Sequence, residues 1–115
     1  MKSANFLSVF SVLWSVSVLA ADIKENKIYH FYQPSCPHCH EAIEYINNRY
    51  PKVDMVLVDI TQGKKNFDLF SACAGKFKLG NQIGTPLFCM GNHYIMGWSE
   101  EQQKQFDQYI KEFEQ

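Results

Sequence analysis

The chain has 115 residues, a formal net charge of −1 at pH 7, and a composition that is 46% hydrophobic and 15% aromatic. This length suits one small domain and excludes several, since domains typically contain about 100 residues or more. The near-neutral charge, without a basic cluster, lacks the electrostatic signature of a nucleic-acid-binding protein. We therefore expect no nucleic acid among its partners.

Residues 1–20 have the features of a secretory signal peptide. Lys2 gives a weakly positive start, residues 6–19 form an apolar run, and small side chains precede a cut after Ala20. We expect the mature domain to be residues 21–115, exported to the periplasm in a bacterium, or to the secretory lumen or the outside in other cells. An uncleaved membrane anchor stays open, because the apolar run approaches the roughly 17 residues that a short spanning helix needs.

A run of β-forming residues at 27–32 predicts a strand, and its lack of polar alternation indicates burial on both faces. The strand ends at Pro34 and leads directly to Cys36. From Pro37 onward apolar residues recur at helical spacing until Pro51, so a helix is expected between these two prolines. Proline suits the first turn of a helix, where its missing N–H leaves no bond unmade.

Residues 53–60 form a second apolar run with the length of a buried strand. The order strand, helix, strand predicts a parallel pair. A second helix is expected at residues 66–79, and Gly80 ends it. The predicted apolar stripe of this helix consists of Phe67, Phe70, Ala74 and Phe77.

Two short apolar runs at residues 86–90 and 93–96 are separated by a Gly-Asn pair, which permits the positive φ angles of a tight hairpin. These two strands are therefore expected to be antiparallel. Ser99 begins a final helix and is expected to form a capping box with Gln102. The predicted order of elements is βαβαββα. The buried face of the final helix is expected to be Phe106, Tyr109, Ile110 and Phe113.

The sequence Cys-Pro-His-Cys at residues 36–39 places two thiols two residues apart, where the first strand gives way to the first helix. Thiols at this spacing can close as a reversible disulfide, and a helix N-terminus favours the thiolate that starts the exchange. We predict that Cys36 is the nucleophile and that Cys39, one turn into the helix, is the buried resolving thiol. Protonated His38 is expected to stabilise the Cys36 thiolate and so to make the pair more oxidising.

Two other functions fit the same residues. Cys36 to His40 also satisfies CxxCH, the attachment motif of c-type haem, with His40 as axial ligand and Met90 or Met96 as the second ligand. A metal-binding or copper-handling module built from Cys36, Cys39 and a histidine is the other alternative. Either would be a carrier without turnover. The β-rich segments that flank the motif favour redox chemistry over a small helical cytochrome.

Cys73 and Cys89 are the other two of the four cysteines. An exported chain with an even number of cysteines invites a second, structural disulfide. Two buried free thiols are equally compatible with the sequence, because the separation of the two residues in space cannot be obtained from it. The pairing of Cys73 with Cys89 therefore stays open.

Three features together resemble the thioredoxin fold: the CxxC after the first strand, Thr85-Pro86 opening the third, and a Gly-Asn hairpin leading to Gly97. The CPHC centre resembles that of bacterial periplasmic disulfide oxidases of the Dsb type. Gly84 before Thr85-Pro86 is closer to the periplasmic isomerases and the glutaredoxins, and the compact size favours a glutaredoxin-like core. The resemblance implies an α/β, thioredoxin-like fold with a mixed four-stranded sheet and helices on both faces.

The same resemblance implies a thiol–disulfide oxidoreductase that acts on protein or peptide thiols and disulfides. We expect a monomer that uses no cofactor and no metal ion. A separate redox partner, in the membrane or outside it, would reset the cysteine pair, and the direction of electron flow stays open. Gly97-Trp98 stands where glutaredoxins often carry a paired glycine, which argues against a glutathione site.

Two further site predictions follow from the resemblance. The Thr85–Pro86 bond is expected to be cis and to face the disulfide, so that Thr85 presents backbone groups to an extended substrate. A trans proline at the start of an edge strand is the alternative. His30 lies where thioredoxins and Dsb oxidases often carry a buried acid, and we predict that it relays the proton to and from Cys39. A hydrogen-bonded core histidine is the alternative for His30.

Overall fold

A mixed four-stranded sheet with the strand order β2-β1-β3-β4 lies at the centre of the computed structural model, which describes residues 22–114. Strand β1 (Ile28–Tyr32) pairs in parallel with β2 (Met55–Asp59) and antiparallel with β3 (Leu87–Met90). Strand β4 (His93–Met96) completes the sheet as the antiparallel hairpin partner of β3. The predicted parallel pair and the predicted hairpin are both present.

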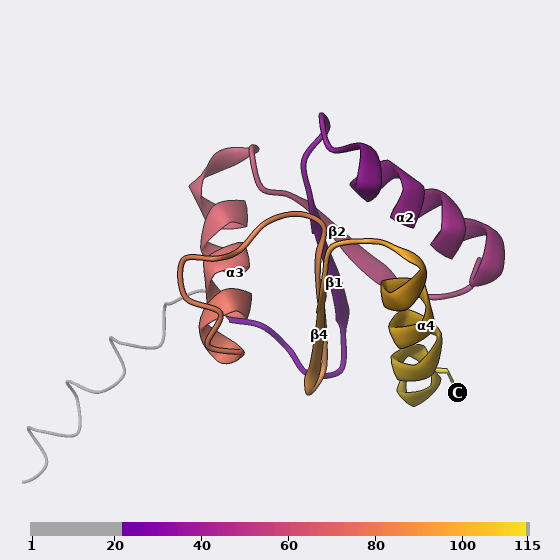
Figure 1. The fold of residues 1–115 in the computed structure, drawn as a ribbon. Coiled ribbons are helices and arrows are strands. Elements are labelled where there is room, and N and C mark those ends of the chain that lie inside the picture. Colours follow the sequence, from indigo (N-terminus) through magenta and orange to yellow (C-terminus); the bar gives the residue numbers. More distant parts are fainter. Residues whose placement is uncertain (1–21, 115) are drawn as a thin grey trace, which may run out of the picture.

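Helices cover both faces of this sheet (Figure 1). Helix α2 (Pro37–Arg49) and helix α4 (Glu100–Tyr109) lie on one side, and helix α3 (Gly63–Lys76) lies on the other. A short 3-10 turn, Ile110–Glu112, follows α4. The order of elements is the predicted βαβαββα, and the expected α/β fold with helices on both faces is confirmed.

Alternation along the strands divides the core into two hydrophobic clusters, one for each face of the sheet. Ile28 of β1 and Phe88 of β3 pack under α2 and α4, with Ala42, Ile46 and Phe106 of those helices. Tyr29 and Phe31 point to the opposite face, where the cluster includes Phe70 and Cys73 of α3, together with Val58, Leu87 and Cys89. Strand β1 is buried on both faces, as its composition predicted.

Strand β2 differs from its prediction. The apolar run indicated a buried strand over residues 53–60, but β2 is the edge of the sheet and spans only Met55–Asp59. Val58 is its one buried residue, and Leu57 keeps 49% of its surface exposed. The apolar composition of a strand gives its length and type, whereas its place in the sheet depends on pairing with distant segments.

Helix α3 begins at Gly63 rather than at residue 66 and ends at Lys76 rather than at 79. Gln62 occupies the N-cap position without a side-chain hydrogen bond, so no capping residue marks this start in the sequence. Lys78 has a left-handed φ of 56°, which stops the helix before Gly80. Phe67 was expected in the apolar stripe, yet it is 49% exposed.

Ser99 is the N-cap residue of α4, as predicted, but the expected capping box does not form. The Ser99 hydroxyl donates to the side-chain Oε1 of Gln102 and caps no backbone N–H. Phe106 and Ile110 are fully buried, whereas Tyr109 and Phe113 are half-buried at the edge of the core. The side of α4 that packs on the sheet is therefore narrower than its periodicity indicated.

Asp107 of α4 holds the C-terminal half of α2 in place. The hydroxyl of Tyr45 donates to Asp107 Oδ2 at 2.9 Å, and the hydroxyl of Tyr50 donates to Oδ1 at 2.6 Å. Burial, followed by the hydrogen bond to Asp107, raises the pKa of Tyr50 to about 12. Both tyrosines therefore stay protonated donors at neutral pH, and α2 is anchored at the end opposite Cys36.

The predicted signal peptide, residues 1–20, lies outside the described residues, so its removal stays a prediction. Between residues 22 and 114, none of the helices has both the length and the apolar composition that crossing a membrane requires.

Candidate functional site

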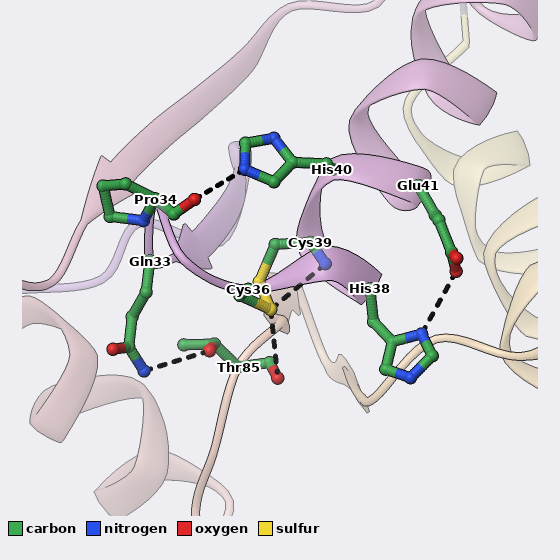
Figure 2. The surroundings of a disulfide bond; sticks show 8 residues. All are labelled: Gln33, Pro34, Cys36, His38, Cys39, His40, Glu41 and Thr85. Atoms are coloured by element: carbon green, nitrogen blue, oxygen red, sulfur yellow. Dashed lines mark hydrogen bonds and ion pairs between the residues drawn. A yellow bond between two sulfur atoms is a disulfide. The ribbon is translucent and has the colours of Figure 1, made fainter.

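Cys36 and Cys39 form a disulfide at the point where β1 gives way to α2, with Cα atoms 5.2 Å apart (Figure 2). Cys36 is the N-cap residue of α2 and is half-buried, whereas Cys39 lies in the first turn with no exposed surface. A reacting partner can therefore reach the sulfur of Cys36 but not that of Cys39. This difference matches the predicted roles of nucleophile and resolving thiol, which stay proposals.

The backbone around Cys36 favours a negative charge on its sulfur. The N–H of Cys39 donates to Cys36 Sγ at 3.1 Å, in the manner of a helix N-cap. Pro37 occupies the first turn, as predicted, and this turn contains no acidic residue that would offset the positive end of the helix dipole. A thiolate at Cys36 would replace the disulfide sulfur as the acceptor of that N–H bond.

Thr85 and Pro86 face this disulfide from the loop before β3. The Thr85–Pro86 peptide bond is cis, and the carbonyl oxygen of Thr85 lies 3.7 Å from Cys36 Sγ. Pro86 is buried, and its carbonyl accepts a hydrogen bond from the N–H of Gly97 at 2.8 Å. Strand β3 is a central strand, so the alternative of a trans proline at the edge of the sheet does not apply.

His38 lies beside Glu41 on the exposed side of α2, with its Nδ1 3.1 Å from Glu41 Oε1 (Figure 2). Both side chains are more than half exposed. Among residues 22–114, no hydrogen bond joins the His38 ring to either sulfur. Any effect of a protonated His38 on the Cys36 thiolate would therefore act through space rather than through a contact.

Two residues near Cys36 that the motif analysis did not assign to the redox site brace the loop between β1 and α2. His40, considered above only as a haem ligand, has its Nε2 2.7 Å from the carbonyl oxygen of Pro34. Gln33 donates from Nε2 to the Thr85 hydroxyl at 3.3 Å. Neither partnership has a sequence signal, because each depends on how the loop folds back in space.

His30 is fully buried in β1 and stacks on Phe88 with ring centroids 4.3 Å apart. His30 lies two residues after Ile28, and side chains at this spacing point to the same face of a sheet. His30 therefore lies on the face that α2 and α4 cover. Neither ring nitrogen has a hydrogen-bond partner within the described residues, so the hydrogen-bonded core histidine is not what the structure contains. Burial lowers the pKa of His30 from 6.5 to about 3, and the imidazole is neutral at neutral pH.

Cys73 of α3 and Cys89 of β3 form a second disulfide, with Cα atoms 6.3 Å apart. Both residues are fully buried, on the face of the sheet opposite to α2. Thiol–disulfide exchange requires that an attacking sulfur reach the bond. Burial therefore separates this disulfide from the exposed chemistry at Cys36, and a structural role stays the prediction.

Removing this second disulfide should lower stability without affecting the redox site. In the Cys73→Ala/Cys89→Ala protein we expect the free energy of unfolding to fall by about 3 kcal/mol, the effect of freeing a loop of this length. Urea unfolding of the two proteins, with Cys36 and Cys39 oxidised in both, measures the difference. An unchanged midpoint would contradict the structural role.

The arrangement of the side chains gives little support to the haem-binding and metal-binding alternatives. Between residues 22 and 114, no group of three or more His, Cys, Asp and Glu side chains lies close enough to hold a metal ion. His40, the axial ligand of the haem alternative, directs its Nε2 at a backbone carbonyl. Met90, one of the two possible second ligands, is fully buried in β3.

Neither a protein-family model nor a curated protein matches the sequence. Solved structures do match the fold. A glutaredoxin from buckwheat, in complex with glutathione, aligns over 75% of this chain and 74% of its own, with a TM-score of 0.52 and 14% identity. A glutaredoxin from Archaeoglobus fulgidus aligns over 79% of this chain and 89% of its own, with a TM-score of 0.51 and 16% identity.

A thioredoxin-like protein aligns over 72% of this chain and 96% of its own, with a TM-score of 0.50 and 19% identity. At such low identities the likeness concerns the fold and not the activity. With the CxxC pair at the N-terminus of α2 and the cis proline opposite it, this chain has the thioredoxin-like fold that glutaredoxins also adopt.

Proposed function

We propose that this protein is an exported thiol–disulfide oxidoreductase that exchanges disulfides with protein or peptide thiols through Cys36 and Cys39. One observation carries the proposal: Cys36 is a half-buried residue at a helix N-terminus, and its sulfur accepts a backbone N–H and is bonded to a fully buried Cys39. This arrangement supplies an accessible nucleophile and a protected partner that can release it.

The exchange proceeds in two steps. In the reduced protein the Cys36 thiolate attacks one sulfur of a substrate disulfide, so that a mixed disulfide forms and the other substrate sulfur leaves as a thiolate. The Cys39 thiol then loses its proton and attacks Cys36 Sγ, which closes the Cys36–Cys39 bond and expels the second substrate sulfur. Two electrons pass from the protein to the substrate, and the reverse sequence oxidises a substrate dithiol.

Thr85 and Pro86 are proposed to bind the substrate backbone. The Thr85 carbonyl faces Cys36 Sγ at 3.7 Å, so a peptide joined to that sulfur would begin beside the Thr85 backbone. Extended peptides bind exposed backbone groups by adding hydrogen bonds of the β type. Pro86 is buried, whereas Thr85 stays partly exposed.

His30 is proposed to relay the proton that Cys39 loses and regains. A neutral imidazole has one N–H donor and one acceptor nitrogen, so it can take up a proton at one nitrogen while it releases another. The pKa of about 3 makes a long-lived imidazolium unfavourable, so His30 would hold the proton only transiently and pass it on to the substrate sulfur, which leaves as a thiolate. Neither ring nitrogen is engaged by another group within residues 22–114, so one of them is free to accept the proton of Cys39.

The Cys36–Cys39 pair is proposed to be oxidising. Interactions that stabilise the Cys36 thiolate stabilise the reduced protein, which raises the reduction potential of the pair. The Cys39 N–H and the α2 N-terminus act in this direction, and a protonated His38 would add to them. Equilibration with glutathione buffers measures the potential, and a value as low as that of thioredoxin, about −270 mV, would contradict an oxidising pair.

Export is supported by the signal-like residues 1–20 and by the second, buried disulfide between Cys73 and Cys89. Structural disulfides persist in oxidising compartments and are rare where thiols are kept reduced. Sequencing the N-terminus of protein purified from its own cells tests the cleavage. Recovery of an intact chain that starts at Met1 would contradict it.

A trapping experiment tests the proposed function. In the Cys39→Ala protein the resolving thiol is missing, so mixed disulfides on Cys36 are expected to persist and to be released by a reductant. Captured exported proteins would support oxidation or isomerisation of substrates, and capture of one membrane protein would identify the partner that resets the pair. The Cys36→Ala/Cys39→Ala protein is the control, and an equal yield from both variants would contradict exchange through Cys36.

A further inference from the structure

The loop from Gln33 to Cys36 is a turn, closed by a hydrogen bond from the Cys36 N–H to the Gln33 carbonyl at 3.1 Å. The Gln33 side chain leaves this turn and crosses to the loop before β3, where its Nε2 donates to Thr85 Oγ1 at 3.3 Å (Figure 2). Gln33 therefore bridges the loop that carries the reactive sulfur and the loop that faces it.

Thr85 has few other restraints on its side chain. The residues before it, 81–84, are exposed or half-exposed, and the Thr85 side chain itself is half-buried. Within residues 22–114, the Gln33 amide is the one hydrogen-bond partner of the Thr85 hydroxyl. The position of Thr85 opposite Cys36 Sγ thus depends on Gln33 on one side and on the buried Pro86 on the other.

We propose that Gln33 is a positioning residue that holds Thr85 in place for substrates with a peptide backbone. This inference rests on the proposed function. A peptide disulfide would use both the Cys36 sulfur and the backbone of Thr85, whereas a small disulfide such as hydroxyethyl disulfide needs only the sulfur. Gln33 therefore contributes to the selection of peptide over small disulfides.

The amide of Gln33 is uncharged, so it positions Thr85 without adding a charge beside Cys36. Two groups favour the thiolate, the Cys39 N–H and the N-terminus of α2. The hydrogen bond from the Gln33 side chain to Thr85 involves neither of them. Loss of the bridge should accordingly change the KM for a peptide disulfide more than the kcat. The reduction potential of the Cys36–Cys39 pair should stay the same.

Gln33→Met tests the proposal, because methionine has a similar length and cannot donate the hydrogen bond. We expect kcat/KM for a peptide disulfide to fall about fivefold, the effect of one neutral hydrogen bond, while kcat/KM for hydroxyethyl disulfide changes by less than about twofold. Thr85→Val should give a similar loss, and Thr85→Ser, which keeps the hydroxyl, should lose less than Thr85→Val. The double variant Gln33→Met/Thr85→Val should be no worse than Thr85→Val alone.

His40→Phe is the matched control, because His40 braces the same loop through Pro34 and makes no bond to Thr85. This variant should affect both substrates to the same extent. An equal loss on both substrates in Gln33→Met, no loss at all, or additive losses in the double variant would overturn the inference. If the wild-type protein exchanges with neither disulfide, the proposed function itself fails and the inference with it.

Discussion

Cys36→Ser is expected to reduce thiol–disulfide exchange about a thousandfold or more. A serine hydroxyl is a poor nucleophile toward sulfur, and the N–H of Cys39 cannot make an alkoxide accessible near neutral pH as it can a thiolate. The measurement is the rate at which the reduced protein cleaves a peptide disulfide, followed as the release of the peptide thiol. Cys36 pairs with Cys39 in the wild type, so Cys36→Ser alone would leave Cys39 without its partner. The variant is therefore assayed with the substitution Cys39→Ala as well.

The control for this loss is the Cys73→Ala/Cys89→Ala protein, which lacks the same number of cysteines as the Cys36→Ser/Cys39→Ala protein. Since Cys73 and Cys89 are buried on the other face of the sheet, exchange should continue in the control at conditions where it is folded. If the control loses activity and the Cys36 variant keeps it, the exchange takes place at Cys73 and Cys89 and not at Cys36 and Cys39.

His30→Phe is expected to flatten the dependence of stability on pH below neutrality. The pKa of His30 is about 3 in the folded protein and near 6.5 when the chain is unfolded, so the unfolded state binds one more proton between these values. The wild type therefore has the full benefit of a neutral His30 above pH 6.5 and loses it as the pH falls toward 3. This loss is on the order of 5 kcal/mol over the whole window.

Phenylalanine at position 30 keeps the stacking on Phe88 and cannot take up a proton. Urea unfolding at several pH values measures the slope in both proteins. Carboxylates contribute to acid unfolding in every variant, so the difference between wild type and His30→Phe is the informative quantity. Equal slopes would contradict the burial of a neutral His30.

The same variant tests the proposed proton relay. If His30 carries the proton of Cys39, the closure of Cys39 on a mixed disulfide at Cys36 should slow in His30→Phe, and its dependence on pH should change. Stopped-flow measurement of the release of the second substrate thiol follows this step. An unchanged pH profile would remove His30 from the mechanism and leave it as a core residue.

The sequence was most informative where a signal is local. The CPHC motif before a helical pattern, Pro37 in the first turn and the Gly-Asn hairpin each depend on residues that are adjacent in the chain, and each was predicted correctly. The edge position of β2 was missed, because strand order results from pairing between distant segments. The start of α3 was missed because Gln62 gives no capping signal.

The features of the candidate site also divide into those with a local sequence signal and those without one. Cys36 and Cys39 were found from their spacing, whereas the cis Thr85–Pro86 bond was expected only through a resemblance. The bridge from Gln33 to Thr85 could not be predicted, because it joins two loops that meet only in the folded chain. The buried disulfide of Cys73 stayed open in the sequence for the same reason.

Titration of the Cys36 thiol in the reduced protein tests the central claim most directly. The pH dependence of its alkylation, measured in the Cys39→Ala variant, should give a pKa below the ordinary value of about 8.5, because the helix N-terminus favours the thiolate. A pKa at or above that value, or a wild-type protein in which Cys36 and Cys39 cannot be reversibly oxidised, would contradict the account.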